Sequence, residues 1–119
     1  MQTGQVTSPL RLIRRLSPLP LDGLRVLELG TFVAAPYCGK LFAGYGADVI
    51  KVEPPGGDIA RAHLPFKDGR PNRETSAFLL YLNTAKRSAA IDVRTPAGRD
   101  AFLRLVERPV PGGLAFLLK

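Results

Sequence analysis

The feature of this sequence that most constrains its fold is a strand, a helix and a second strand within roughly 30 residues. Residues 24–29 (LRVLEL) and 48–53 (DVIKVE) are short apolar runs, which are typical of strands. Between them, Pro36 suits the first turn of a helix and Gly46 suits a helix C-terminal cap. Two strands joined in this way are parallel, and their crossover is right-handed.

The pattern continues with two more helices and one more strand. Residues 74–83 predict a short helix, and residues 87–93 predict a third strand. Thr95 is a good N-cap, and Pro96 fits the first position of a helix that runs to about residue 108. We therefore expect an α/β fold with three parallel strands. A chain of 119 residues is long enough for one small domain.

Several single residues of the first helix and the loops have simple structural interpretations. Tyr37, Leu41 and Tyr45 are spaced four apart and so lie on one side of the helix, and we expect Tyr37 in the core. Cys38 is interpreted as a small buried apolar residue. His63 has no visible partner in the sequence, and we expect it to be incidental.

The end of the second strand is the place where a ligand is expected. Prolines and glycines at 54–57 stop the strand and turn the chain, directly after the carboxylate of Glu53. Open α/β sheets bind their ligands at the carboxyl ends of strands. The turn after the first strand has only Gly30, with Phe32 and Ala35 where a dinucleotide fingerprint needs glycine. The pattern thus argues against a classical NAD site.

The composition limits the partners. The chain carries 17 Lys and Arg against 10 Asp and Glu, a net charge of +7, which favours an anionic partner. The cations are scattered and no nucleic-acid-binding motif is present, so we expect no nucleic-acid partner. No apolar run approaches the ~20 residues of a membrane span, and we expect no membrane partner. One cysteine and one histidine argue against a structural zinc site, and we expect no metal.

Two charged motifs leave alternatives open. Lys86 and Arg87, in NTAKRS, have suitable chemistry for holding phosphate, but a solvated basic turn explains them equally well. Asp58 and Arg61, in GGDIAR, are close enough in sequence to meet across one turn. An ion pair that orders the loop is favoured over a ligand site there.

Taken together, the ordered motifs of residues 21–108 resemble one family, the class III CoA-transferases (the CaiB/BaiF or formyl-CoA transferase family). The resemblance rests on LDGLRVLEL, the AAP of the first helix, GADVIKVEPPGGDIAR, NTAKRS, and the strand aspartate followed by TPAGR. It implies a Rossmann-like parallel sheet with βαβ units, incomplete relative to the family fold. It also implies coenzyme A or acyl-CoA and a carboxylic acid as substrates, a cytoplasmic location, and a homodimer for the full-length protein.

The resemblance also implies which residues bind CoA. Phe32 and Val33 match positions near the thioester end, and residues 91–94, placed in the third strand, match a segment that lines the adenosine-phosphate part. Lys86 and Arg87 match a basic pair of the family. The expected CoA-binding residues are therefore Phe32, Val33, Lys86, Arg87, Ile91, Asp92, Val93 and Arg94.

This sequence departs from the family in two respects. Family members are several times longer, and none of the aspartates here matches the catalytic aspartate, so we expect no catalytic residue in this chain and no activity from it alone. The match also breaks at Pro109. We divide the chain into a loosely ordered basic extension (1–20), the N-terminal part of a CoA-transferase-like Rossmann domain (21–108) and a divergent tail (109–119). The alternatives are a non-catalytic CoA- or nucleotide-binding module, or a relative of the acyl-CoA racemases.

Overall fold

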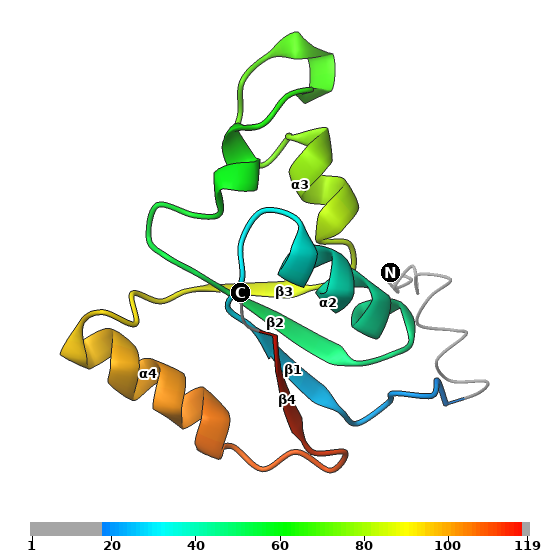
Figure 1. Ribbon diagram of the computed structural model, residues 1–119, viewed down its shortest axis with the longest axis vertical. Helices are drawn as coiled ribbons and strands as arrows, with labels where there is room; N and C mark the ends of the chain where they lie inside the picture. The colour runs from blue at the N-terminus through cyan, green and yellow to red at the C-terminus, as the bar shows by residue number, and fades with distance from the viewer. Residues whose placement is uncertain (1–17, 118–119) are drawn as a thin grey trace, which may run out of the picture.

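The computed structural model describes residues 18–117, which form one four-stranded parallel sheet. The strands are β1 (Arg25–Glu28), β2 (Asp48–Glu53), β3 (Arg87–Ala90) and β4 (Leu114–Leu117). Their order across the sheet is β3-β2-β1-β4 (Figure 1). The α/β fold class with a parallel sheet is therefore confirmed. The predicted extension lies outside the described residues as far as residue 17.

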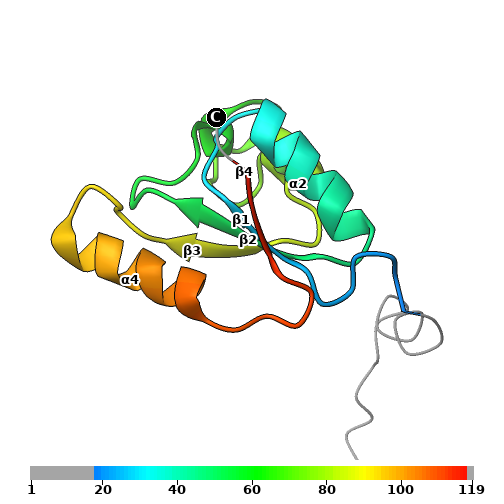
Figure 2. The ribbon, with the colours of Figure 1, turned by 60° about the horizontal axis from the view of Figure 1, so that its bottom comes forward.

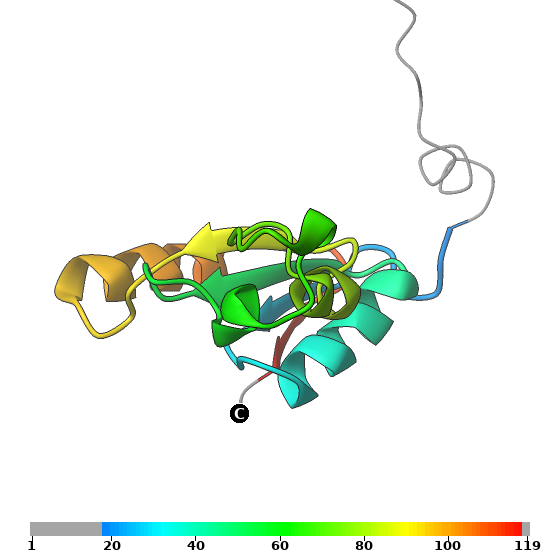
Figure 3. The same ribbon diagram turned by 90° about the horizontal axis from the view of Figure 1, so that it is seen from above.

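Three α-helices and two short 3₁₀ helices connect the strands. They are α2 (Ala34–Gly44), η1 (Ile59–Ala62), η2 (Lys67–Gly69), α3 (Ala77–Leu82) and α4 (Pro96–Glu107). Figure 2 shows α2 on one face of the sheet and α4 on the other, and Figure 3 shows the same separation from above. Right-handed crossovers require helices on both faces of this sheet. The chain moves across the sheet from β1 through β2 to β3, and the crossover from β3 to β4 runs across the sheet in the opposite direction. No helix in the described part is both long and apolar enough to cross a membrane.

The small residues of α2 face the sheet. Ala35, Gly39 and Ala43 are buried at a spacing of four, and Ala43 packs with Val26 and Val49 in the core. The opposite side of α2 is exposed, so the prediction of Tyr37 in the core is wrong: its exposed fraction is 45%. The physical reason is that small residues let the helix lie close to the sheet, which leaves the larger side chains outside. Cys38 is half-buried rather than buried.

The ends of the predicted elements are mostly confirmed. The second strand has its predicted bounds, and Gly46 follows the C-cap of α2 with a φ of +103°, as a terminating glycine requires. Thr95 caps α4 by accepting the Gly98 N–H, with Pro96 in the first turn. The helix predicted over 74–83 is shorter, because the Ser76 hydroxyl caps it by accepting the Leu79 N–H.

The third strand ends earlier than predicted. It stops at Ala90, so residues 91–94 lie after the strand and not in it. The Ile91 N–H still donates to the Glu53 carbonyl, but Asp92 then accepts the Arg94 N–H on its side chain and the Thr95 N–H on its carbonyl. This turn replaces the last part of the predicted strand.

A fourth strand corrects the expectation of three. Residues of the tail form β4, which pairs in parallel with β1, so that Val26 faces Ala115. The Arg25 N–H donates to the Gly113 carbonyl, and Gly112 lies so close to the backbone of Gly23 that a Cβ there would be 2.5 Å from it. The strand order equals the first part of the Rossmann order, and the direction of chain progression reverses between β1 and β4.

Candidate functional site

A buried chain of four charges lies beneath α2 at the carboxyl ends of β1 and β2. The Lys51 ammonium is 2.7 Å from Asp58 Oδ2 and 2.9 Å from Glu28 Oε1, and Glu28 Oε2 is 2.7 Å from the Lys86 ammonium. The four side chains are at most 2% exposed. Two positive and two negative charges leave the group neutral, which is what allows it to be buried. We call Glu28, Lys51, Asp58 and Lys86 the buried charge quartet.

The strand pattern explains how the quartet forms. Glu28 is opposite Lys51 in the β1–β2 register, and Val26 is opposite Val49 two residues earlier. Because side chains alternate between the faces of a sheet, these four residues share the face that α2 covers. That face is therefore apolar toward the amino ends of the strands and charged toward their carboxyl ends.

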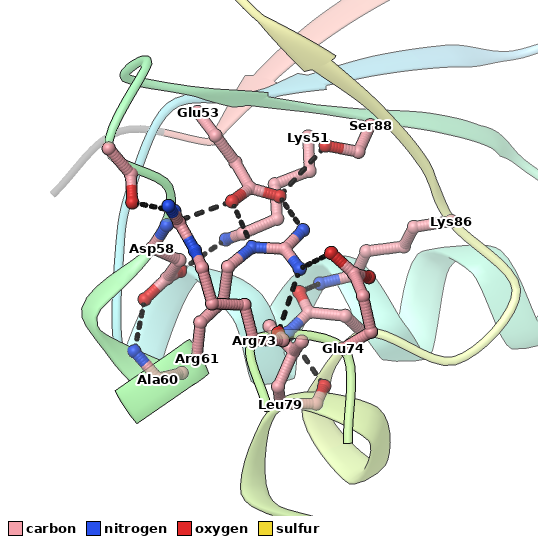
Figure 4. Close-up of polar contacts among 12 residues, drawn as sticks. Lys51, Glu53, Asp58, Ala60, Arg61, Arg73, Glu74, Leu79, Lys86 and Ser88 are labelled. Carbon is pink, nitrogen blue, oxygen red and sulfur yellow. Dashed lines mark hydrogen bonds and ion pairs between the residues drawn. The ribbon is translucent and has the colours of Figure 1, made fainter. Parts of the chain in front are cut away.

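Glu53 lies at the end of β2, and both oxygens of its carboxylate accept hydrogen bonds from other groups of the protein (Figure 4). The Arg61 guanidinium binds it with two hydrogen bonds of 2.8 Å, and the Asp58 N–H and the Ser88 hydroxyl each donate at 2.8 Å. The predicted Asp58–Arg61 ion pair is therefore wrong. Asp58 pairs with Lys51, and Arg61 pairs with Glu53 and Glu74.

The stability of the fold is expected to fall in acid as Glu53 becomes protonated. Burial alone would raise the pKa of Glu53, but Arg61, the Asp58 N–H and Ser88 together lower it from 4.5 to about 2. A folded-state pKa below the unfolded value means stabilisation above pH 4.5 that is lost as the pH falls toward 2. The shift corresponds to about 3 kcal/mol.

Urea unfolding measured between pH 7 and pH 2 checks this expectation. The Glu53→Gln variant removes the ionisable group but keeps its size. Its free energy of unfolding is expected to be lower at pH 7 and to change less between pH 5 and pH 2 than that of the unaltered chain. Parallel curves for the two proteins would contradict the assignment.

A pocket of about 270 Å³ opens at the carboxyl edge of the sheet. Its lining residues come from the ends of β1 and β2 and from the turn after β3: Leu29, Val52, Pro54, Ile91, Asp92, Val93 and Arg94. Arg94 binds Asp92 with hydrogen bonds of 2.9 and 3.0 Å, and this pairing lowers the pKa of Asp92. Exposed ion pairs contribute little to stability, so the Arg94 guanidinium is free to exchange its partner for a bound anion.

The turn between β1 and α2 lies at the same edge. Phe32 has a φ of +69°, and its N–H donates to the Asp58 carboxylate. Its ring centroid is 4.9 Å from that of His63 and 5.1 Å from that of Phe78. His63, expected to be incidental, is thus part of a three-ring cluster. Val33 follows as the N-cap of α2 and is exposed.

A sequence model of CoA-transferase family III matches residues 21–109, most of the chain. The chain belongs to this family. The turn after β1 and the pocket at the carboxyl edge both lie within the matched region. The identification agrees with the resemblance carried by the sequence motifs.

Similar proteins include two enzymes and a protein of solved structure. The succinyl-CoA:mesaconate CoA-transferase of Haloarcula hispanica is 47% identical over 88 residues, which are 74% of this chain and 22% of that protein. The 2-methylfumaryl-CoA isomerase of Chloroflexus aurantiacus is 43% identical over 90 residues, 75% of this chain and 21% of that protein. A crystal structure of a CaiB/BaiF family protein from Brucella suis matches with a TM-score of 0.65 and 42% identity, covering 74% of this chain and 23% of that one. The chain thus spans about a fifth of the length of these relatives.

The structure separates the expected CoA-binding residues into three places. Residues 91–94 line the pocket at the carboxyl edge, and Phe32 and Val33 lie in the turn after β1. Lys86 and Arg87 line a different cavity of about 370 Å³, together with residues of α3.

The basic pair has protein partners for its charges. The Lys86 ammonium is within 2.9 Å of Glu28 Oε2, the Pro36 carbonyl and Asn83 Oδ1. Burial lowers the pKa of Lys86, and the pairing with Glu28 opposes that effect. Arg87 lies at the amino end of β3, where it binds Asp48 with two hydrogen bonds. A role of this pair as phosphate ligands stays a prediction.

Sequence reasoning missed the roles of Glu28, Lys51 and Asp58. The signal that could have found them is the period of two along the strands. Glu28 follows Val26 and Lys51 follows Val49 on the same buried face, and opposite charges at matching positions of adjacent strands indicate a pair. The quartet also explains why charged side chains lie inside otherwise apolar strands of this chain.

Proposed function

We propose that this chain supplies the N-terminal, CoA-binding part of a CoA-transferase, formed by residues 21–108. The full enzyme moves coenzyme A from an acyl-CoA thioester to a carboxylic acid, through an aspartyl nucleophile outside this chain. The observation that carries the proposal is the pocket at the carboxyl edge of the sheet, which four of the expected CoA-binding residues line. Parallel α/β sheets bind nucleotides at this edge.

The expected CoA-binding residues have different proposed roles. Ile91 and Val93 provide apolar walls for the adenosine, and Arg94 exchanges Asp92 for a phosphate of CoA. Phe32 and Val33 lie toward the thioester end. Lys86 acts indirectly, through the buried charge quartet that lies under α2. Acyl-CoA and a carboxylate are the proposed substrates, and a homodimer in the cytoplasm is proposed for the full-length protein.

Titration of the purified chain with coenzyme A tests the binding proposal. Arg94→Gln is expected to weaken CoA binding about tenfold, because a hydrogen bond to a charged group is lost. Arg104→Gln, which removes a charge from the last turn of α4, is the matched control and should leave the affinity nearly unchanged. If the unaltered chain does not bind CoA, or if the two variants bind it equally, the proposed pocket is wrong.

An isomerase or racemase is the second candidate. It is favoured by the 2-methylfumaryl-CoA isomerase relative, whose identity to this chain is close to that of the transferases. Isotope-labelled free acid separates the two in an enzyme that carries this chain. A transferase places the label in the thioester, whereas an intramolecular isomerase leaves it in the free acid. CoA binding with neither reaction would support a non-catalytic binding module.

A further inference from the structure

Phe32 holds a backbone conformation that its side chain disfavours. Its φ of +69° lies in the left-handed region, where a bulky L-residue is an outlier. Such strain persists only where the surrounding structure holds it, and it is concentrated at functional sites. Other groups of the protein must therefore hold Phe32 in this conformation.

The buried carboxylate of Asp58 holds the backbone of Phe32. The Phe32 N–H lies 3.1 Å from Asp58 Oδ1 and 3.3 Å from Oδ2. Asp58 is itself fixed: its side chain is fully buried, Oδ2 pairs with Lys51 at 2.7 Å, and Oδ1 accepts the Ala60 N–H at 2.9 Å. The carboxylate cannot follow a movement of the turn without breaking these contacts.

The ring of Phe32 is held independently of its backbone. It stacks in a tilted arrangement with His63, which follows η1, and with Phe78 of α3. The His63 and Phe78 rings also contact each other, with centroids 5.4 Å apart. Backbone and ring are thus held by two segments that follow β2, although Phe32 itself follows β1.

We propose that Asp58 is a positioning residue, whose carboxylate, fixed by Lys51, holds the Phe32 backbone and so sets the turn that meets the thioester end of CoA. This inference rests on the proposed function, because the turn has this role only if the chain binds CoA there. Asp58 does not touch the ligand: it is buried, and it acts through the Phe32 N–H.

Two double variants separate this role from the burial of charge. Lys51→Met/Asp58→Asn removes both charges but leaves an amide oxygen that accepts the Phe32 N–H. Lys51→Met/Asp58→Ala removes the same charges and also the acceptor. Both are compared with the unaltered chain by CoA titration and by the amide resonance of Phe32.

The Asn variant is expected to keep the Phe32 amide resonance downfield and to bind CoA about tenfold more tightly than the Ala variant. Equal CoA affinities of the two folded variants would overturn the proposal. The unaltered chain provides a measurement that needs no folded variant. Its Phe32 N–H should be protected from hydrogen exchange despite lying in a turn, and rapid exchange would overturn the proposal as well.

The two proposals fail in different ways. If the unaltered chain does not bind CoA, the proposed function fails for this chain. The Phe32 resonance and its exchange rate still report whether Asp58 holds the turn. If the chain binds CoA but the Asn and Ala variants do so equally, the proposed function stands and the role of Asp58 is refuted.

Discussion

Lys51→Met is expected to lower the free energy of unfolding by about 3–5 kcal/mol. The Lys51 ammonium is the group that neutralises Asp58, and it shares Glu28 with Lys86. Without it, a fully buried carboxylate loses its positive partner, and its remaining hydrogen bonds cannot supply that charge. Domains of this size are stable by only about 5–15 kcal/mol, so the loss is a large part of the total. Urea unfolding at pH 7 measures the effect.

An exposed ion pair of the same sheet is the control. Arg87→Gln breaks the pair with Asp48 at the amino ends of β2 and β3, where the Arg87 side chain is 63% exposed. Solvent screens such pairs, and the expected loss is below about 1 kcal/mol. The contrast depends on burial rather than on distance, since the Arg87–Asp48 pair is as short as the Lys51–Asp58 pair. Similar losses for the two variants would show that the quartet is not a buried charge system.

The double variant Lys51→Met/Asp58→Asn extends this prediction. It removes one positive and one negative charge, and the Glu28–Lys86 pair remains complete. Replacing both partners of a buried pair is often close to neutral, whereas removing one is costly. The double variant should therefore be more stable than Lys51→Met alone. A double variant that is less stable would place the main contribution of Lys51 elsewhere, for example in its hydrogen bond to the Gly30 carbonyl.

The βαβ unit could be predicted from the sequence because strand ends, helix caps and terminating glycines depend mainly on residues that are neighbours in the chain. The second strand, the Gly46 terminator and the Thr95–Pro96 helix start were all confirmed for this reason. The outward orientation of Tyr37 was missed, because the choice between two sides of α2 depends on how closely the helix packs on the sheet. The strand β4 was missed because its pairing partner, β1, lies almost 90 residues away in the sequence.

In the candidate site, too, local motifs could be predicted from the sequence and long-range contacts could not. The family motifs predicted residues 91–94 as CoA-binding, and these four consecutive residues line one pocket, after the strand and not within it; that they bind CoA stays a prediction. The motifs said nothing of the partners of each charge. Asp58 was paired with Arg61 because they are near in sequence, yet its charge partner Lys51 lies within β2, the strand that precedes it, and Asp58 accepts the N–H of Phe32, which follows β1. The fold of the loop back onto β2 decides the first of these pairings, and the packing of this loop against the turn after β1 decides the second.

Gly39→Ala is expected to destabilise the chain, against the helix propensity of alanine. A Cβ at this position of α2 would lie 2.0 Å from Glu28 Oε2 and 3.2 Å from the Lys86 side chain. The Glu28 carboxylate cannot move away freely, because it is buried and held by Lys51 and Lys86. The methyl group must therefore displace α2 or break the quartet, at an expected cost of about 3 kcal/mol.

Gly44→Ala supplies a control of opposite sign in the same helix. No atom lies within 4 Å of a Cβ placed at Gly44, which is exposed at the end of α2. Alanine there gains helix propensity without a clash, and the variant is expected to be more stable by up to about 1 kcal/mol. Thermal unfolding of the two variants separates the gain in helix propensity from the cost of the clash with Glu28. If Gly39→Ala lowers the stability and Gly44→Ala raises it, then contact with the buried carboxylate, rather than backbone flexibility, requires glycine at position 39. A stabilising Gly39→Ala would instead show that α2 lies farther from the sheet than this packing implies.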